Sequence, residues 1–337
     1  MASGPNIAAL IEAWAPQIAK AFLEAVALIR DRAQVGQIAT MLERGDFEGA
    51  LRAVGLDPAV FRSLDTAVAQ AFEAGGNATT TKIPASRTAV GHRLDILFNA
   101  RNPEAEGWLR DHSASLVAEI VEDQRTMIRA TLTAGMEKGR SPRDVALDLV
   151  GRINRTTRRR EGGAIGLTAS QEEWVRNYEA ELAAGDPKAL TRTLRDRRFD
   201  RTVAKAIREG QPIPAETLAK MVAAYRNRAL RYRGEAIGRT EAMAALHKAQ
   251  DESFRQAIAA GQVEARVVRR VWRSAGDARV RDSHRHLNGT SVGFNQSFLT
   301  ARGARLKFPG DPAAPASEIV NCRCHLEIRI DFLANVD

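Results

Sequence analysis

The sequence predicts a mainly α protein, with an extended multi-helix N-terminal region followed by a small α+β C-terminal domain that has short antiparallel strands. Three observations predict this class. Apolar residues recur at steps of three and four over roughly the first 260 residues. Alanine is abundant and aromatic residues make up only 5%, which favours helices. Residues typical of strands and turns gather after Gly261.

The N-terminal stretch is predicted to be helical. Pro16 is expected to kink or divide the first helix. Gly45 and Gly55 are expected to end the helices of a following hairpin. Asp57 and Pro58 suit an N-cap and a first helical position, so another short helix is predicted to begin there. The apolar face of the first helix consists of Ile7, Leu10, Ile11, Trp14, Ile18, Phe22, Val26 and Ile29.

Composition divides the chain into four ranges. A small, polar stretch broken by Pro84 predicts a linker. Helical patterns lie before and after it, and a change to strand-like composition marks the last range. The predicted ranges are a helical region at 1–75, a linker at 76–90, a helical region at 91–236 with a basic loop near 152–163, and a C-terminal domain at 237–337.

The second helical region contains several helix boundaries. A long helix is expected to end at Gly135 and Gly139, and Ser141 is expected to cap the next one. Ser170 and Glu173 have the spacing of a capping box, which predicts another helix start.

Two successive helices are predicted between the Pro212–Pro214 interruption and Gly261. Beyond them, 267–273 has the pattern of a strand, and Asn288 with Gly289 predicts a turn. The buried stripe of the first of these helices is predicted to be Leu218, Met221, Val222, Tyr225 and Ala229. A final strand is predicted from the alternation of Cys324, Leu326, Ile328 and Ile330.

The formal net charge of +9 suits contact with a polyanion, nucleic acid above all, and equally suits a solvated helical surface. The basic loop has the same two interpretations, as a phosphate-contacting arm or as a solvated loop. Its candidate DNA contacts are Arg155, Arg158, Arg159 and Arg160. Two further sets are Arg192, Arg195, Arg197, Arg198 and Arg201, and Arg226, Arg228, Arg231 and Arg233.

Cysteine usage and hydropathy predict a cytosolic protein. The chain has two cysteines, and a disulfide across a single intervening residue would be strained, so reduced thiols are expected. The N-terminus lacks the basic start of a signal peptide. No apolar run reaches the length of about 20 residues that a membrane span needs, so no membrane contact is expected.

Short motifs in the last third of the chain follow one another in a fixed order. Their residues are Arg239, Thr240, Glu241, Trp272, Asp277, Arg279, Arg281, His284, Leu287, Gly289, Pro309, Gly310, Asp311, Asn321, Cys322, Arg323 and Cys324. In this order and spacing, residues 237–330 resemble the phage head morphogenesis family, the minor head proteins similar to the Mu protein F and the SPP1 gene 7 product.

The resemblance implies a minor head protein, from a phage or a prophage, that acts in head assembly and in genome delivery. Its implied partners are the portal protein, the major capsid or scaffold proteins, and double-stranded DNA bound without sequence preference. It also implies assembly in the bacterial host cytoplasm, followed by residence in the virion head.

The sequence is not expected to encode an enzyme, because H-E-x-x-H, zinc-deaminase and Walker motifs are all missing. The alternative is a metal-dependent nuclease or another DNA-acting enzyme built around His284 and the Cys322 and Cys324 pair. Asn288 and His325 would then be further members of the site.

Two thiolates in a turn can supply two corners of a tetrahedral zinc site, and His284 could supply a third. One structural zinc would join the two ends of the small domain and contribute folding energy. Alternatively, the two thiols pack inward, Asn321 caps a turn and Arg323 pairs with a carboxylate such as Asp277. The candidates for a fourth ligand are Asp277, Asp282, His286 and His325.

Overall fold

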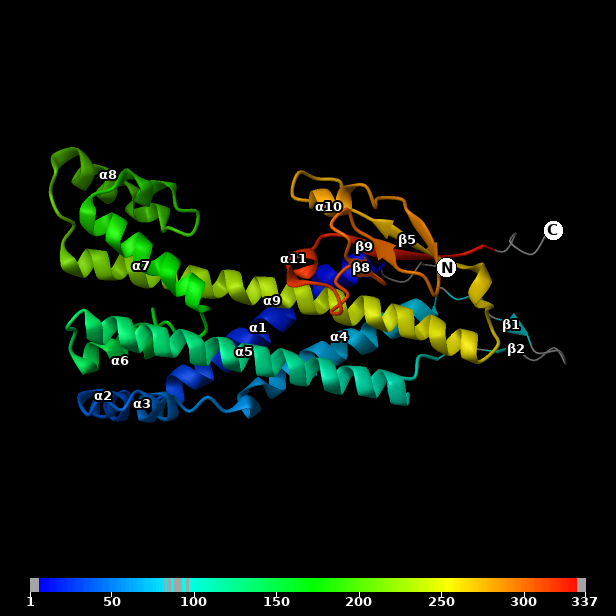
Figure 1. Cartoon of the computed structure of the whole chain (residues 1–337), viewed down its shortest axis with the longest axis horizontal. Coiled ribbons are helices and arrows are strands. Elements are labelled where there is room, and N and C mark those ends of the chain that lie inside the picture. The colour runs from blue at the N-terminus through cyan, green and yellow to red at the C-terminus, as the bar shows by residue number, and fades with distance from the viewer. Residues whose placement is uncertain (1–5, 82, 84–85, 88–92, 95–96, 332–337) are drawn as a thin grey trace. The chain divides into compact units, whose positions relative to one another are not determined.

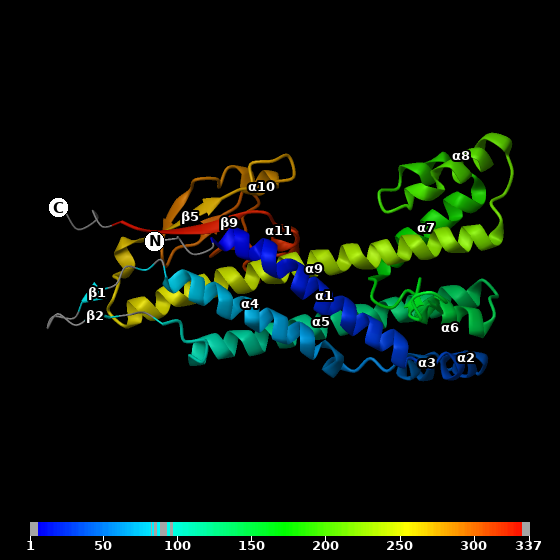
Figure 2. The same cartoon turned by 180° about the vertical axis from the view of Figure 1, so that it is seen from behind.

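The computed structural model describes residues 6–81, 83, 86–87, 93–94 and 97–331, drawn from two sides in Figure 1 and Figure 2. Helices dominate these residues, and the C-terminal region carries a three-stranded antiparallel sheet. The predicted fold class is therefore confirmed. Among the described residues, no helix combines the length and the apolar character needed to cross a membrane.

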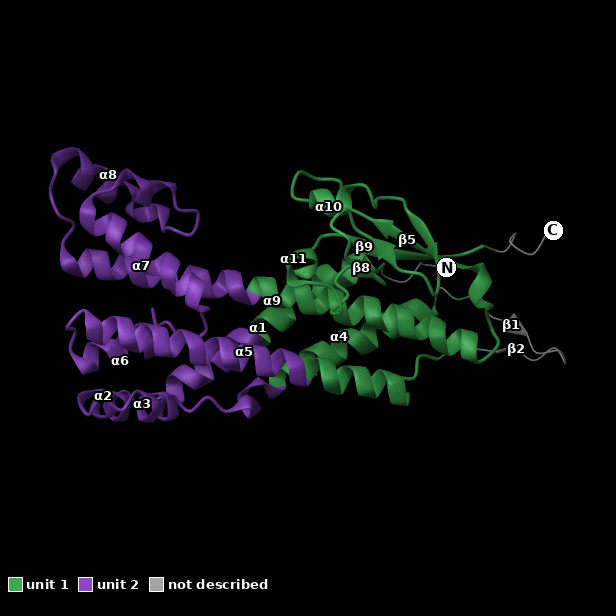
Figure 3. Cartoon of the chain, in the orientation of Figure 1, with its two compact units in different colours: residues 1–21, 63–113, 235–337 green, residues 22–62, 114–234 purple. Residues whose placement is uncertain are grey.

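The chain forms two compact units, coloured separately in Figure 3. Each unit combines segments that are far apart in the sequence, because three long helices contribute residues to both. The four continuous ranges proposed from composition stay a prediction. Unit 1 consists of residues 1–21, 63–113 and 235–337, and unit 2 of residues 22–62 and 114–234.

The first helices begin and end largely at the predicted residues. Gly55, with φ of 71°, ends α3, and the Asp57 side chain accepts a hydrogen bond from Ala59 N. α1 passes through Pro16 as one helix, so of the two predicted outcomes, a kink or a division, the division does not occur. Its buried face extends to both sides of the proline, which offsets the roughly 3 kcal/mol cost of proline in a helix. The elements are α1 (Ile7–Arg32), α2 (Val35–Glu43), α3 (Phe47–Val54), the 3-10 helix η1 (Pro58–Phe61) and α4 (Arg62–Thr80).

The start of the predicted linker is helical instead, because α4 continues to Thr80. Its two glycines permit close packing within unit 1. A Cβ on Gly75 would lie 3.1 Å from Leu246 Cα, and one on Gly76 would overlap the Phe98 ring. Part of the remaining linker prediction lies outside the described residues. Within the described part, β1 (Ser86–Arg87) pairs with β2 (Arg93–Leu94).

A helical pair and a short hairpin follow. α5 passes through Gly135, where a Cβ would lie 2.7 Å from Val145 of α6, and ends before Gly139. The glycine therefore serves helix packing rather than termination. Ser141 caps α6 as predicted, since its Oγ accepts from Asp144 N at 3.1 Å. The elements are α5 (Pro103–Glu137), α6 (Pro142–Val150), β3 (Arg152–Ile153) and β4 (Arg160–Glu161).

The predicted capping box is displaced by two residues. Thr168, not Ser170, caps α7: Gln171 N donates to Thr168 Oγ1, and Thr168 N donates to Gln171 Oε1. Both pairs satisfy the same spacing rule, so the local sequence alone did not distinguish them. The elements are α7 (Ala169–Ala184), the 3-10 helices η2 (Pro187–Thr191) and η3 (Arg197–Phe199), and α8 (Asp200–Glu209).

A single helix, α9 (Ala215–Ala259), replaces the two helices predicted before Gly261. Gly238 lies within it because α9 packs closely on α1 there: a Cβ would approach Ala19 N to 2.8 Å. Four of the five predicted stripe residues are buried, and Leu218 is half-buried. Gly261, with φ of 69°, follows the end of α9 as predicted.

The C-terminal sheet has the strand order β6-β5-β9, and both pairings are antiparallel. Trp272 faces Leu326 across the β5 and β9 pair, and both are buried. A core of Phe254, Ala257 and Val268 packs α9 to the sheet. The elements are η4 (Ala265–Val267), β5 (Val268–Arg273), α10 (Asp282–Arg285), β6 (Ser291–Gly293), β7 (Phe298–Leu299), β8 (Arg305–Leu306), α11 (Ala316–Ile319) and β9 (His325–Ile330).

Candidate metal centre

The two cysteines lie in the turn that joins α11 to β9. Asn321 has φ of 55°, a left-handed conformation that Asn adopts more readily than most residues. Cys322 N donates to Ile319 O at 3.1 Å, which closes the turn. Both cysteines are free thiols, with exposed fractions of 1% and 2%. The turn thus directs Cys322 and Cys324 into the interior.

His284 of α10 meets the two thiols in the interior. Its Nδ1 atom lies 3.5 Å from Cys322 Sγ and 3.8 Å from Cys324 Sγ. The ring is fully buried and contacts the Trp272 ring edge-on at a centroid distance of 5.0 Å. Among the described residues, His284, Cys322 and Cys324 are the group whose ligand atoms converge, all within 4.8 Å of one another. Three of the four residues predicted as metal ligands are therefore together.

Glu318 contacts the opposite side of the His284 ring. Its Oε2 lies 2.8 Å from His284 Nε2 and accepts a hydrogen bond from Ser283 Oγ, also at 2.8 Å. Glu318 is only 1% exposed. The sequence analysis missed this residue, because the Ala- and Pro-rich sequence around Glu318 gives no sign that its side chain is buried.

The two thiols influence each other's ionisation. A hydrogen bond from Cys324, and then one from His284, lower the pKa of Cys322, although burial acts in the opposite direction. The same Cys322 interaction, together with burial, raises the pKa of Cys324. One thiolate is therefore stabilised at this pair, and the thiolate is the nucleophilic and metal-binding form of cysteine.

Asp277 lies outside the group of His284, Cys322 and Cys324, so the structure does not bring this fourth predicted ligand together with the other three. Its carboxylate instead forms an ion pair with Arg323, the residue between the two cysteines. The sequence suggested this Arg323–Asp277 pair as part of the alternative in which the thiols pack inward without a metal. In the structure the pair is present, and the two thiols also converge on His284. The other candidate fourth ligands, Asp282, His286 and His325, are also outside the group. Asp282 and His286 are exposed.

The Arg-Thr-Glu step of α9 holds the cysteine turn. Arg239 Nε donates to Cys322 O at 3.1 Å, and Asn321 N donates to Thr240 Oγ1 at 3.2 Å. Glu241 Oε2 lies 2.6 Å from His112 Nε2 of α5. Two members of this motif thus position the backbone around the thiols, while the third binds α9 to a neighbouring helix.

Further motif residues stabilise the same region, residues 237–330, here called the C-terminal module. Arg281 Nε donates to Ser317 O at 2.8 Å, and its Nη2 donates to Val320 O, which links α10 to the segment before the cysteines. Gly289, with φ of 83°, donates to Trp272 O at 2.8 Å. These residues hold the His284 segment and the cysteine turn in register.

The Pro309-Gly310 step contacts α9 through a residue that the sequence did not single out. His247 Nδ1 lies 2.7 Å from Pro309 O, and Leu326 N donates to His247 Nε2 at 3.1 Å. Gly310 has φ of 80°, and a Cβ there would lie 3.1 Å from Met243 Cβ. The loop therefore needs glycine both for its conformation and for its distance from α9.

His284 is poorly placed for the alternative nuclease. Its ring is fully buried and both nitrogens face protein groups, so a phosphodiester could not reach it without local opening. Asn288 Oδ1 accepts from Ser274 N instead of joining the cluster. The geometry favours a structural centre over a hydrolytic one.

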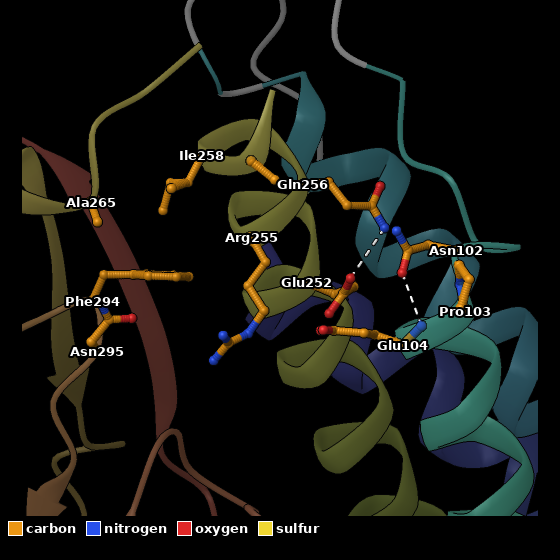
Figure 4. A pocket seen from close by; sticks show the side chains of 11 residues that line it. Asn102, Pro103, Glu104, Glu252, Arg255, Gln256, Ile258, Ala265, Phe294 and Asn295 are labelled. Carbon is orange, nitrogen blue, oxygen red and sulfur yellow. Dashed lines mark hydrogen bonds between the residues drawn. The ribbon is translucent and has the colours of Figure 1, made fainter. Parts of the chain in front are cut away.

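A separate pocket of about 480 Å³ lies within unit 1 (Figure 4). Glu252, Gln256 and Phe294 line it, together with Arg255. Glu252 Oε1 accepts from Gln256 Nε2 at 3.3 Å, and Arg255 Nε donates to Asp251 Oδ2 at 2.9 Å. Three of the polar side chains that line the pocket, those of Glu252, Arg255 and Gln256, therefore already have hydrogen-bond partners in the protein.

The basic loop is the hairpin of β3 and β4. The side chains of Arg155, Arg158 and Arg159 are exposed and form no hydrogen bond or ion pair with another described residue. Arg160 is half-buried and donates to Gly151 O, so it contributes to the hairpin itself. Three of the four predicted phosphate contacts are therefore free for a ligand.

The two other arginine sets serve largely as structural cations in unit 2. Arg226 forms a buried ion pair with Glu172, and Arg233 Nη2 lies 2.7 Å from Asp123 Oδ2. Such pairs satisfy charges that would be costly to bury alone. The remaining paired members are Arg192 with Glu181, Arg195 with Asp200, and Arg198 and Arg228 with Asp196.

Comparison with known proteins identifies the segment that carries this centre. Residues 197–327 match the family model described as "Phage Mu protein F like protein". Over 104 residues the chain is 33% identical to "Uncharacterized protein YqbB" of Bacillus subtilis (strain 168). That match covers 30% of this chain and 32% of the relative, so the chain spans about a third of the curated relative's length.

No solved structure matches the chain. The family match includes α9, the Trp272 to Gly289 segment, the Pro309-Gly310 loop and the cysteine turn, which are the elements joined by the contacts described above. Residues 197–327 are therefore similar to the phage Mu protein F-like family, and this match confirms the resemblance to phage head morphogenesis proteins predicted from the motifs.

Proposed function

We propose that this protein is a minor head protein that acts in phage head assembly, beside the portal or the packaged DNA. The observation that carries the proposal is the family match over 197–327, which includes every motif residue from Arg239 to Cys324. Those residues form a network whose centre is buried, as expected of a module that holds a shape. Assembly would take place in the host cytoplasm, and the protein would then reside in the virion head.

The proposed partners are the portal protein and the major capsid or scaffold proteins. The test is to delete the gene from the phage or prophage genome that carries it, and to supply the protein from a plasmid. We expect the deletion to reduce heads filled with DNA, as counted by electron microscopy, and the plasmid to restore them. Normal yields of filled, infectious heads without the protein would contradict the proposal.

A second part of the proposal is contact with double-stranded DNA through the β3 and β4 hairpin. Arg155, Arg158 and Arg159 are exposed there and lack partners among the described residues. Each phosphate contact contributes about 0.9 to the slope of log affinity against log salt. Replacing all three arginines by glutamine should therefore weaken binding and lower the slope by up to about 3.

The slope is measured by fluorescence anisotropy with labelled duplexes of two unrelated sequences. The matched control removes three scattered exposed cations, in the variant Arg110→Gln, Lys138→Gln and Arg302→Gln. Equal losses in both triple variants would mean that net charge alone governs binding. In that case the hairpin would be a solvated loop and not a DNA contact.

The nuclease alternative has a direct assay. Purified protein with divalent metal should leave supercoiled plasmid intact, because His284 is buried. Nicking that is lost in His284→Ala, but kept in His286→Ala, would establish the alternative and contradict the structural interpretation.

A further inference from the structure

We propose that Cys322, Cys324 and His284 bind one zinc ion, and that Glu318 orients His284 for it from outside the coordination shell. This inference goes beyond the assembly function, which would hold with or without a metal. It assigns the cluster a ligand, and it gives Glu318 a role that burial alone does not explain.

The first argument is the spacing of the ligand atoms. Zinc bonds of about 2.3 Å to sulfur and about 2.0–2.1 Å to nitrogen, at tetrahedral angles, place sulfur and nitrogen about 3.6 Å apart. The observed separations from His284 Nδ1 are 3.5 Å to Cys322 Sγ and 3.8 Å to Cys324 Sγ. Both distances from His284 Nδ1 therefore fit a zinc shell, and the ligand atoms of all three residues lie within 4.8 Å of one another.

The second argument concerns buried polar atoms. His284 Nε2 and Glu318 Oε1 have no aligned hydrogen-bond partner among the described residues, although both are in the interior. Such atoms are rare because an unmade hydrogen bond is costly to bury. If Nδ1 binds a metal, the imidazole proton is on Nε2, which lies 2.8 Å from Glu318 Oε2 although the two atoms are not aligned as a hydrogen bond in this structure. Metal-bound histidines commonly donate their second N–H to a carboxylate in this way.

The third argument is the position of the ligands in the chain. His284 follows β5, whereas the cysteines precede β9, and 38 and 40 residues separate His284 from them. A metal bound to both segments would close this loop in the C-terminal module and stabilise a small domain. Glu318 is held by Ser283, the neighbour of His284, so the same two segments also meet outside the shell. The described residues supply three ligands, which leaves the fourth tetrahedral position for water or another small ligand.

The first experiment uses the full chain, purified under reducing conditions without chelator. Elemental analysis should give about one zinc per chain. Its replacement by cobalt should produce thiolate charge-transfer absorption and the intense visible bands of a tetrahedral site. Absence of metal, stoichiometric binding of a different metal, or a mass two hydrogens lower that indicates a Cys322 to Cys324 disulfide would each overturn the assignment.

The second experiment identifies the ligands. Cys322→Ser, Cys324→Ser and His284→Ala should lose zinc, while His286→Ala should keep it because His286 is exposed and outside the cluster. Should a ligand variant fail to fold, the wild-type protein gives a second readout. Its two thiols should resist alkylation until a chelator is added; equal alkylation before and after chelation would contradict metal binding.

The third experiment tests Glu318 as a positioning residue. Glu318→Ala should keep the one-to-one stoichiometry but lower zinc affinity by about 10- to 100-fold, measured by competition with a chelating dye. Glu318→Gln retains an acceptor oxygen and should restore part of that loss. Unchanged affinity in Glu318→Ala, or no recovery in Glu318→Gln, would show that the glutamate does not act through the imidazole.

Discussion

At the scale of single residues, His247 shows how a neutral imidazole can join separate segments. It bridges the Pro309 carbonyl and the Leu326 amide, so one ring nitrogen donates and the other accepts. Burial lowers the pKa of His247 to about 3, although the hydrogen bond to Pro309 O acts to raise it. The folded protein therefore keeps this histidine neutral at pH values where an unfolded chain protonates it.

The depressed pKa of His247 predicts a pH-dependent stability. Because only the unfolded state takes up this proton between pH of about 6.5 and 3, the native state should lose stability as the pH falls. The slope from this group approaches about 1.4 kcal/mol per pH unit. Urea unfolding at several pH values should show that the difference in the free energy of unfolding between wild type and His247→Gln becomes smaller as the pH falls. A gap that stays constant with pH would contradict a neutral, buried His247.

Gly310 gives a second prediction at the residue scale, with a matched control in the same module. Gly310 and Gly303 both have φ near 80°, but only Gly310 has a close neighbour, Met243 Cβ. Alanine at either position should cost about 1–2 kcal/mol for the left-handed conformation, and Gly310→Ala should cost more because of the contact. Thermal unfolding measures both. Equal losses would mean that the approach to α9 does not constrain this loop.

At the scale of elements, the start of α7 distinguishes two overlapping capping patterns. The Thr168 side chain accepts from Gln171 N, while Ser170 is the second residue of the helix. Thr168→Ala should therefore destabilise the protein by about 1 kcal/mol, and Ser170→Ala should have a much smaller effect. Denaturant unfolding of the two variants is the measurement. A larger loss from Ser170→Ala would restore the capping box that the sequence first suggested.

The helices were predictable where local chemistry determines them. Asp57, Ser141 and Gly55 act at helix ends as their residue types predict, because caps and left-handed ends depend on a few neighbouring atoms. Gly135 was misleading because it permits close packing against Val145 of the neighbouring helix and does not end α5. A glycine inside a helix can mark either an end or a close contact, and only the tertiary structure decides between them.

At the scale of the whole molecule, residue type and motif order predicted the centre but not its surroundings. Cys322, Cys324 and His284 were predicted together because thiols and imidazole share a chemistry. The position of Glu318 depends on which segments fold against each other, whereas the pairing of Arg323 with Asp277 was one of the alternatives that the sequence suggested. The arginines show the same limit. Composition suggested a polyanion-binding surface, yet Arg226 and Arg233 neutralise buried or partly buried carboxylates in unit 2.

The proposed function makes this chain a component of the phage head. The most direct measurement is mass spectrometry of purified particles, after tails and free host proteins have been separated from heads. We expect the protein in the head fraction at a constant ratio to the portal protein, in wild type and in the His286→Ala control. A protein found only in the soluble host fraction, and absent from heads that contain portal and DNA, would contradict the account.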